Sequence, residues 1–202
     1  MEQEKVWDAL AEQWYHFRQQ QFRDVKAEIG DISNLKPGKI LEIGCGSCRN
    51  LLPFAKQGFD CYGVDFSKNM LKFAKEYCEK YDFKVNLKKA RAEELPFQDS
   101  SFDYILSIAT LHHLNRKEQE AAVKEMARVL KPDGIALITV WSKFPMSIFV
   151  KQKYISWTVK GKAYHRYHYL FTPFELKRLL KRHGFRIIAC GRKKNLIVVA
   201  KK

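Results

Sequence analysis

The sequence predicts an α/β fold of three layers, with a mostly parallel sheet between two layers of helices. Short apolar runs of strand length alternate with segments in which apolar residues recur at helical spacing. Such alternation is typical of sheets that bind ligands at the carboxyl ends of their strands. Gly44 and Gly46 follow the first apolar run and predict a strand-to-helix turn at which bare backbone can approach a ligand.

The length and composition of the chain fit a single domain, residues 1–202. The 202 residues are 46% hydrophobic, which is enough to bury a sizeable core. No apolar run approaches the roughly 18 residues of a membrane span, and the acidic start (MEQE) does not resemble a signal peptide. We therefore expect a cytoplasmic protein.

The first half of the chain is predicted to open with a helix within residues 1–30. Val6, Leu10 and Trp14 are spaced as on one face of that helix. Strands are then predicted from short apolar runs, and helices from longer periodic segments. In order, the predicted elements are helix 4–29, strand 39–43, helix 47–57, strand 60–64, helix 67–80, strand 84–88 and strand 102–108.

Two helices of the second half are predicted from their first turns. Residues 115–118 (NRKE) resemble a capping box for a helix that runs to Leu130. Residues 172–175 (TPFE) combine an N-cap hydroxyl, a proline at the first helical position and a glutamate at the third. Gly184 is expected to end this second helix.

The end of the chain is predicted to add an antiparallel edge to the sheet. Residues 131–134 (KPDG) are expected to turn into strand 135–141. Strands 185–190 and 195–200 are separated by so few residues that they must form a hairpin. Residues 142–171 are too many for a plain loop and are expected to form a cover over the site.

The first glycine turn and a later acid predict a pocket for a nucleoside cofactor. Asp65 ends the second predicted strand, where a carboxylate can accept hydrogen bonds from ribose hydroxyls. A dinucleotide site needs a third glycine, but Arg49 occupies that position. Glu42 would repel a diphosphate, whereas it suits an ammonium group. The pattern therefore favours S-adenosyl-L-methionine (SAM), which has an ammonium, a sulfonium and no phosphate, over NAD; a plain tight turn is the alternative.

The positive charge of the chain is concentrated in its last quarter. The net charge is +15, and residues 151–202 contain fifteen Lys or Arg but one acid, Glu175. A polyanion partner is therefore expected, with a surface that serves only solubility as the alternative. Tyrosines and histidines interleave with basic residues in 162–169 (KAYHRYHY), as in proteins that bind single-stranded RNA. This segment lacks the periodicity of a membrane-binding helix, so RNA is favoured.

The cysteines do not indicate a disulfide framework or a metal site. Their number, five, is odd, and they are scattered along the chain. Cys45 and Cys48 form a C-x-x-C pair, but a structural zinc ion needs four ligands and no second pair exists. We expect no bound metal.

From Trp7 onward the chain resembles class I SAM-dependent methyltransferases. The resemblance implies a three-layer Rossmann-like methyltransferase fold, with a mostly parallel seven-stranded sheet and an antiparallel C-terminal hairpin, and SAM as the cofactor. The motifs that carry it are residues 41–46 (LEIGCG), 63–65 (GVD), 92–97 (AEELPF), 101–104 (SFDY) and 128–132 (RVLKP).

Three further segments resemble the tRNA wobble-uridine carboxymethyl methyltransferases. They are residues 107–114 (SIATLHHL), 140–141 (VW) and 166–171 (RYHYLF). That family esterifies the carboxylate of 5-carboxymethyluridine at the anticodon, often with a small zinc-containing activator subunit. The resemblance therefore implies a tRNA partner. Cys48 departs from the family pattern where a third glycine is usual, and Arg91 departs from it where an aspartate is common.

The resemblance also implies the cofactor contacts. Residues of the glycine turn would line the methionine end of SAM, the acid after the second strand would bind the ribose, and residues beyond it would surround the adenine and sulfonium. His112 is added because it follows the end of strand 102–108, where ligands bind. The expected cofactor-binding residues are Glu42, Gly44, Gly46, Asp65, Phe66, Ala92, Glu93, Ile108 and His112.

Esterification of a carboxylate needs placement more than a base, because the carboxylate is already ionised at neutral pH. Arg18 and Arg166 are candidates for orienting it, since a guanidinium can hold a carboxylate through two hydrogen bonds. With His113, Arg18 is assigned to catalysis. The expected substrate-binding residues are Trp14, Arg166, Tyr167 and Tyr169, although the tyrosines could instead pack the cover onto the sheet.

Two other functions fit the same residues. One is a methyltransferase that acts on a metabolite or a lipid head group, with a basic tail that serves solubility. The other is a module that binds SAM or RNA without catalysis.

Overall fold

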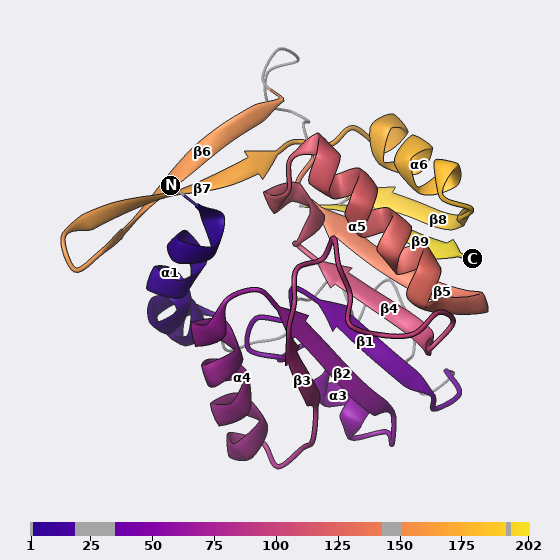
Figure 1. The fold of residues 1–202 in the computed structure, drawn as a ribbon, viewed down its shortest axis with the longest axis horizontal. Helices are drawn as coiled ribbons and strands as arrows, with labels where there is room; N and C mark the ends of the chain where they lie inside the picture. The colour runs from indigo at the N-terminus through magenta and orange to yellow at the C-terminus, as the bar shows by residue number, and fades with distance from the viewer. Residues whose placement is uncertain (1, 19–34, 143–150, 193–194) are drawn as a thin grey trace.

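A seven-stranded sheet forms the centre of the molecule, with strand order β3-β2-β1-β4-β5-β9-β8 (Figure 1). The computed structural model describes residues 2–18, 35–142, 151–192 and 195–202. Strands β1 to β5 pair in parallel, whereas β9 is antiparallel to both of its neighbours. The predicted fold class is confirmed. The strands are β1 (Lys39–Ile43), β2 (Asp60–Asp65), β3 (Asn86–Lys89), β4 (Phe102–Ile108), β5 (Leu130–Val140), β8 (Arg186–Arg192) and β9 (Leu196–Lys201).

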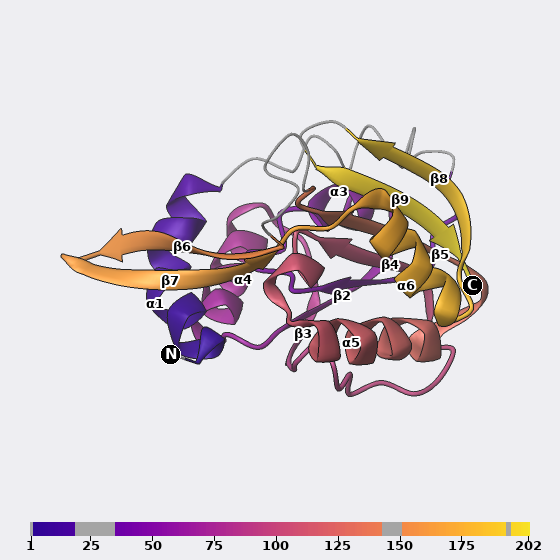
Figure 2. The ribbon, with the colours of Figure 1, turned by 90° about the horizontal axis from the view of Figure 1, so that it is seen from above.

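Helices cover both faces of the sheet because successive strand residues point to opposite sides. Leu41 packs in a core with residues of α5 and α6, whereas its neighbour Ile40 packs in a second core with residues of α3 and α4. Figure 2 shows α5 and α6 together on one side. Helix α1 packs on α4 and carries a third small core. The helices are α1 (Gln3–Phe17), α3 (Leu52–Ala55), α4 (Lys68–Lys80), α5 (Arg116–Val129) and α6 (Pro173–Arg182).

The two predicted capping boxes are present. The Asn115 side chain accepts hydrogen bonds from the backbone N–H groups of residues 117 and 118, and Glu118 accepts one from the Asn115 N–H at 2.8 Å. Thr172 and Glu175 make the same reciprocal contacts at the start of α6. No helix in the described parts of the chain is long and apolar enough to cross a membrane.

The predicted helix 47–57 is wrong in extent, because only α3 forms there. Cys48 has a φ of +58°, and this left-handed conformation cannot belong to a right-handed helix. The predicted turn 131–134 lies inside β5 as a bulge, since Phe102 pairs with Leu130 and Tyr104 pairs with Ile135. Helix α1 corresponds to the first part of predicted helix 4–29, and residues 19–29 lie outside the described residues.

The predicted cover contains a β-hairpin that the sequence analysis did not identify. Strands β6 (Gln152–Val159) and β7 (Lys162–Tyr169) form a two-stranded antiparallel sheet, and residues 143–150 lie outside the described residues. The hairpin lies beside α1 and extends beyond the main sheet (Figures 1 and 2). It is held there by a hydrogen bond of 2.7 Å from the Trp157 indole N–H to Gln13 Oε1.

Candidate active site

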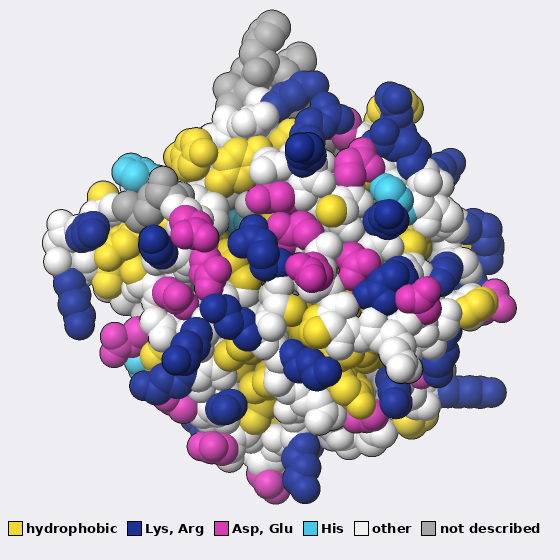
Figure 3. All heavy atoms as spheres, viewed as in Figure 1, with side chains coloured by type: hydrophobic (Ala, Val, Ile, Leu, Met, Phe, Trp, Pro, Cys, Tyr) yellow, Lys and Arg dark blue, Asp and Glu magenta, His cyan; other side chains and the backbone are white. Residues whose placement is uncertain are grey.

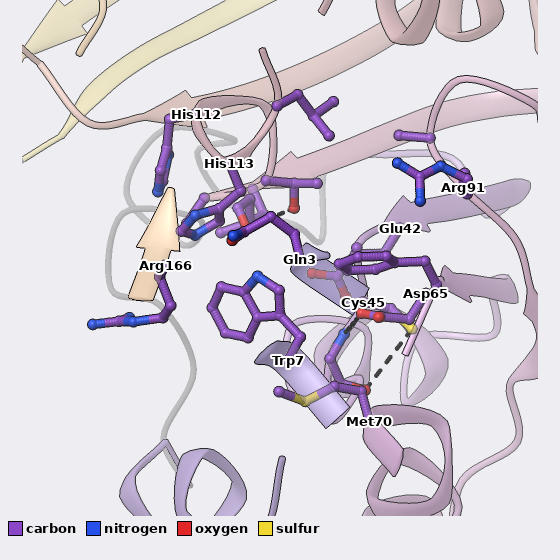
Figure 4. Close-up of a pocket in the computed structure, with 18 of the residues that line it drawn as sticks. Gln3, Trp7, Glu42, Cys45, Asp65, Met70, Arg91, His112, His113 and Arg166 are labelled. Atoms are coloured by element: carbon purple, nitrogen blue, oxygen red, sulfur yellow. Dashed lines mark hydrogen bonds between the residues drawn. The ribbon is translucent and has the colours of Figure 1, made fainter. Parts of the chain in front are cut away.

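A cavity lies at the carboxyl ends of β1, β2 and β4, and α1 and the β6–β7 hairpin close it from the opposite side. The sheet therefore supplies the glycine turn and acids, while α1 and β7 supply tryptophans and arginines. Figure 4 shows Glu42, Cys45 and Asp65 toward one side of this cavity, with His112, His113 and Arg166 toward the other and Trp7 between them. We describe the two ends in turn.

The glycine turn requires its glycines. Gly44 has a φ of +68°, and an added Cβ would lie only 2.6 Å from Cγ2 of Thr110. Gly46 has a φ of +53° with nothing within 4 Å of an added Cβ, so its backbone is bare. The Gly46 N–H donates a hydrogen bond of 3.0 Å to Asp65 Oδ2, which fixes the turn against the end of β2.

Glu42 presents an unpartnered oxygen to the cavity. It is 1% exposed, and its Oε1 accepts a hydrogen bond of 2.6 Å from the Asn50 amide. Its Oε2 is buried and has no hydrogen-bond partner among the described residues. Burial raises the pKa of Glu42 to about 8. Such a group gains from a cationic ligand, which fits the ammonium of SAM.

Asp65 is held by two backbone N–H groups, since Ser67 donates to its Oδ1 at 2.9 Å and Gly46 donates to its Oδ2. Burial raises the pKa of Asp65 to about 6. Each carboxylate oxygen keeps a lone pair, which fits the expected contact with ribose hydroxyls.

Phe66, Ala92 and Glu93 also line the cavity. Arg91, at the position that departs from the family pattern, lies over the Phe66 ring at 5.8 Å and pairs with Glu93 at 3.1 Å. The charge of Arg91 is thus balanced locally, and its side chain borders the place expected for adenine.

Two further arginines of the cavity lining, Arg166 and Arg18, lie against tryptophan rings. Arg166 of β7 is 5% exposed, and its guanidinium lies over the rings of Trp157, Trp14 and Trp7 at 5.0, 5.3 and 5.8 Å. Arg18 follows α1 and lies over the Trp14 ring at 5.1 Å. The Nε atoms of both arginines are buried without a hydrogen-bond partner, and neither guanidinium forms an ion pair with an acid among the described residues.

Three histidines also line the cavity. Burial lowers the pKa of His113 to about 3 and the pKa of His168 to about 4. Burial also lowers the pKa of His112. All three rings are therefore neutral at physiological pH. One ring nitrogen of each histidine lies within 4.8 Å of one ring nitrogen of each of the others.

All but two of the predicted site residues line this cavity. Its lining includes the expected Trp14, Arg18, Glu42, Gly44, Gly46, Asp65, Phe66, Ala92, Glu93, Ile108, His112, His113 and Arg166.

The structure corrects the expectation that Tyr167 and Tyr169 contact a substrate here. Side chains alternate along β7, so those of Arg166 and His168 face the cavity while the two tyrosines point to the opposite face. The Tyr169 hydroxyl donates to Glu175 at 3.2 Å in the core, and Tyr167 packs against Tyr154. Tyr167 acts through its backbone, because its carbonyl oxygen accepts from His113 Nδ1 at 2.9 Å.

Several lining residues were not predicted. Gln3 and Trp7 share one face of α1 with Trp14, and their helical spacing could have identified them. Asn50 and His168 carried no such signal, because their positions depend on the glycine turn and on the hairpin.

Comparison with known proteins agrees with this geometry. Residues 41–138, slightly less than half of the chain, match the methyltransferase domain family. Over 160 residues the chain is 28% identical to a ubiquinone biosynthesis O-methyltransferase of Rickettsia typhi, covering 77% of this chain and 62% of that protein. The chain thus spans about three-fifths of the length of the curated relatives it matches.

Solved structures show the same fold. A SAM-dependent methyltransferase of Methanosarcina mazei superposes with a TM-score of 0.74 at 24% identity, covering 91% of this chain and 98% of that one. A 1,6-didemethyltoxoflavin-N1-methyltransferase of Burkholderia thailandensis, solved with S-adenosylhomocysteine, gives 0.71 at 20% identity, covering 98% and 88%. Residues 41–138 therefore match a methyltransferase domain, and the solved methyltransferase structures share the fold of this chain.

Proposed function

We propose that the chain, a class I SAM-dependent methyltransferase, esterifies the carboxylate of 5-carboxymethyluridine at the wobble position of a tRNA. The observation that carries the proposal is that Arg18 and Arg166 both line the cavity, with Arg166 on the side away from Glu42 (Figure 4). Among the described residues, neither guanidinium has an acidic partner. An anionic group of the methyl acceptor would supply one.

The electrostatics of this pair favour an anion. Burial lowers the pKa of Arg18 and of Arg166, and the charge of Arg18 lowers that of Arg166 further. A buried cation without a partner is costly, so a carboxylate between the two side chains would relieve both. Because tryptophan rings flank the Arg166 guanidinium, its planar fork is held in place for a bidentate contact.

The chemistry needs no proton transfer. SAM supplies an electrophilic methyl group on its sulfonium. A carboxylate oxygen forms the new C–O bond while the C–S bond breaks and sulfur keeps the electron pair. The protein must therefore orient the carboxylate and exclude water rather than provide a base. Because the pKa values of His113 and His168 lie far below 7, these side chains would be weak bases in any case.

The placement of cations supports an RNA partner. Helix α6 carries Lys177, Arg178, Lys181 and Arg182 but only one acid, whereas α5 has four cations and three acids. Figure 3 shows Lys and Arg side chains along the edge where Figure 1 places α6 and β8. The hairpin adds exposed lysines and Tyr154, which is 66% exposed and could stack on a base. A small zinc-containing activator subunit stays a prediction of the family resemblance.

A hydroxyl acceptor is the second candidate, because the relatives in bacteria are named ubiquinone biosynthesis O-methyltransferases. Methylation of a phenol requires removal of its proton. The histidines at the acceptor end are poorly suited to that step.

Transfer of labelled methyl from SAM distinguishes these functions. We expect label to enter total tRNA, to be released by mild alkali as an ester, and to appear as the methyl ester of 5-carboxymethyluridine in nucleoside mass spectrometry. Label that enters RNA but survives alkali would contradict the ester. Label that enters a catechol or another phenol but not RNA would favour the second candidate, and SAM binding without transfer to either would indicate a non-catalytic module.

Substitution of Arg166 tests the carboxylate contact. We expect Arg166→Lys, which keeps the charge but loses the planar fork, to raise the KM for tRNA while the affinity for S-adenosylhomocysteine is unchanged. Lys75→Ala is the matched control, because Lys75 is exposed on α4 and does not line the cavity. Assays with and without the activator subunit decide whether it is needed.

A further inference from the structure

The cavity histidines His112, His113 and His168 do not all carry their proton on the same ring nitrogen. His113 Nδ1 lies 2.9 Å from the Tyr167 carbonyl oxygen, and His168 Nδ1 lies 3.0 Å from the Arg166 carbonyl oxygen. A carbonyl oxygen only accepts, so Nδ1 of each ring carries the proton. The Nε2 atom of each ring therefore has a free lone pair.

His112 has the opposite tautomer. Its Nδ1 accepts a hydrogen bond of 3.2 Å from the Trp141 backbone N–H, so its proton is on Nε2. The cluster thus offers two lone pairs rather than the three that a three-histidine metal site requires. The Arg166 guanidinium on the same strand further disfavours a cation here.

The two lone pairs lack a partner within the described protein. His168 is fully buried, and its Nε2 has no hydrogen-bond partner. His113 is half-buried, and its ring lines the same cavity. A buried acceptor without a donor is costly, and such groups are usually satisfied by a ligand or by water. The low pKa values keep both rings neutral, so their Nε2 atoms act as acceptors and not as donors.

We propose that Nε2 of His113 and Nε2 of His168 share the hydrogen bond donated by a neutral N–H or O–H group of the methyl acceptor. The pair would select an acceptor that carries such a donor close to its carboxylate. This inference rests on the proposed function. A charged donor is excluded because Arg18 and Arg166 would repel it.

The spacing on β7 suits an acceptor of this kind. Arg166 and His168 are two residues apart on one face of the strand, and such side chains stand about 6 to 7 Å apart. A carboxylate at Arg166 would therefore place a donor a few atoms away at His168. In 5-carboxymethyluracil, the carboxymethyl group is on C5, and the C4 carbonyl separates C5 from the N3–H of the imide. This N3–H is the expected donor.

The first test compares two acceptors on the wild-type enzyme. An anticodon-loop RNA that contains 5-carboxymethyluridine is compared with the same RNA methylated at N3 of that base. We expect kcat/KM to be about ten- to a hundred-fold lower for the N3-methylated RNA, because the donor is lost while the buried Nε2 of His168 is left without a partner. Equal kcat/KM values would overturn the inference and leave the proposed function standing. Methylation of neither RNA would overturn both.

The second test asks whether His113 causes the difference in kcat/KM between the two RNAs. His113→Phe keeps a ring against Trp7, which packs on His113 at 4.8 Å, but removes the Nε2 lone pair together with the Nδ1–H that donates to the Tyr167 carbonyl oxygen. We expect this variant to lose activity on the RNA that is not methylated at N3. The ratio of the kcat/KM values for the two RNAs should therefore fall toward one. His113→Gln, which retains an acceptor near the Nε2 position, should restore part of the ratio.

His165→Phe is the matched control, because His165 is exposed on β7, pairs with Ser156 and does not line the cavity. Its ratio should equal that of the wild type. A wild-type ratio in His113→Phe, with unchanged affinity for S-adenosylhomocysteine, would contradict the inference for that residue. If His113→Phe does not fold, the comparison of the two RNAs on the wild type still decides.

Discussion

The Asn50 side-chain amide donates a hydrogen bond of 2.6 Å to Glu42 Oε1 and leaves Oε2 of the same carboxyl group without a partner. Glu42 is thus half satisfied by the protein. Burial raises its pKa to about 8, so the unliganded protein keeps this carboxyl group mostly protonated at neutral pH. A ligand ammonium beside Oε2 would favour the ionised form.

We therefore expect the affinity for S-adenosylhomocysteine to rise with pH between 6.5 and 8. Below the pKa of Glu42, the carboxyl group must lose its proton before it can pair with the ligand ammonium. The affinity for S-adenosylhomocysteine should therefore rise by up to about tenfold per pH unit until the pH reaches this pKa. Calorimetry in two buffers with different ionisation enthalpies should detect proton release. Glu42→Gln should bind more weakly and lose the pH dependence; an equal slope in this variant would assign the proton to another group.

A glycine can be required by a positive φ alone or also by a close neighbour, and substitution can separate these two constraints. Gly44 and Gly58 both have positive φ, but only Gly44 would bring an added Cβ against a neighbour, Thr110. Gly58→Ala should lower the free energy of unfolding by about 1 to 2 kcal/mol through strain alone, without an effect on ligand affinity. Gly44→Ala should lower it further and abolish binding of S-adenosylhomocysteine.

Urea unfolding and calorimetry measure both effects. Thr110→Ala combined with Gly44→Ala should recover part of the lost stability, because the clash involves Oγ1 and Cγ2 of the threonine. Equal stability losses for Gly44→Ala and Gly58→Ala would show that contact with Thr110 is unimportant.

The capping box of α6 should affect stability only. In Thr172→Ala the Glu175 N–H loses its acceptor, the Thr172 hydroxyl, so we expect a loss of about 1 kcal/mol in the free energy of unfolding. Thr172→Ser should retain most of it. Because Thr172 does not line the cavity, the affinity for S-adenosylhomocysteine should be the same in all three proteins, and a change in it would contradict this separation.

The main sheet was predictable because its signals are local. Apolar runs defined the strands, and the two capping boxes defined the starts of α5 and α6. The failure at residues 47–57 has a local cause too, since nothing in the composition of that segment indicates that Cys48 adopts a positive φ. Its conformation follows from the glycine turn, which closes with a hydrogen bond from the Cys48 N–H to the Cys45 carbonyl oxygen.

The hairpin was not predictable in the same way. Its two strands mix lysines, histidines and arginine with aromatic residues, and they are stabilised by packing on α1, far away in the sequence. Without the strand assignment, the residues of 162–169 could not be divided between two faces. This is why the sequence analysis groups Arg166, which lines the cavity, with Tyr167 and Tyr169, which do not.

The attachment of the hairpin to α1 should control acceptor binding. The Trp157 indole donates to Gln13, and the Tyr167 N–H donates to Gln3 Oε1 at 3.0 Å, so α1 holds the strand from which Arg166 reaches the cavity. Gln13→Ala removes the hydrogen bond to the Trp157 indole. We expect a several-fold rise in the KM for tRNA, unchanged affinity for S-adenosylhomocysteine, and faster amide hydrogen exchange in residues 152–169, because the hairpin opens more often.

Gln13→Glu keeps an acceptor for the indole and is the control for this change. Thr158→Ala changes an exposed hairpin residue and leaves the contacts with α1 intact. Amide hydrogen exchange in the rest of the hairpin of this variant should match that of the wild type. Unchanged exchange in Gln13→Ala would mean that ring packing between Trp14 and Trp157, at 5.7 Å, is sufficient to hold the hairpin. In that case Trp14→Leu should loosen the hairpin instead, because it removes the ring that contacts Trp157 edge to face while it keeps an apolar side chain on α1.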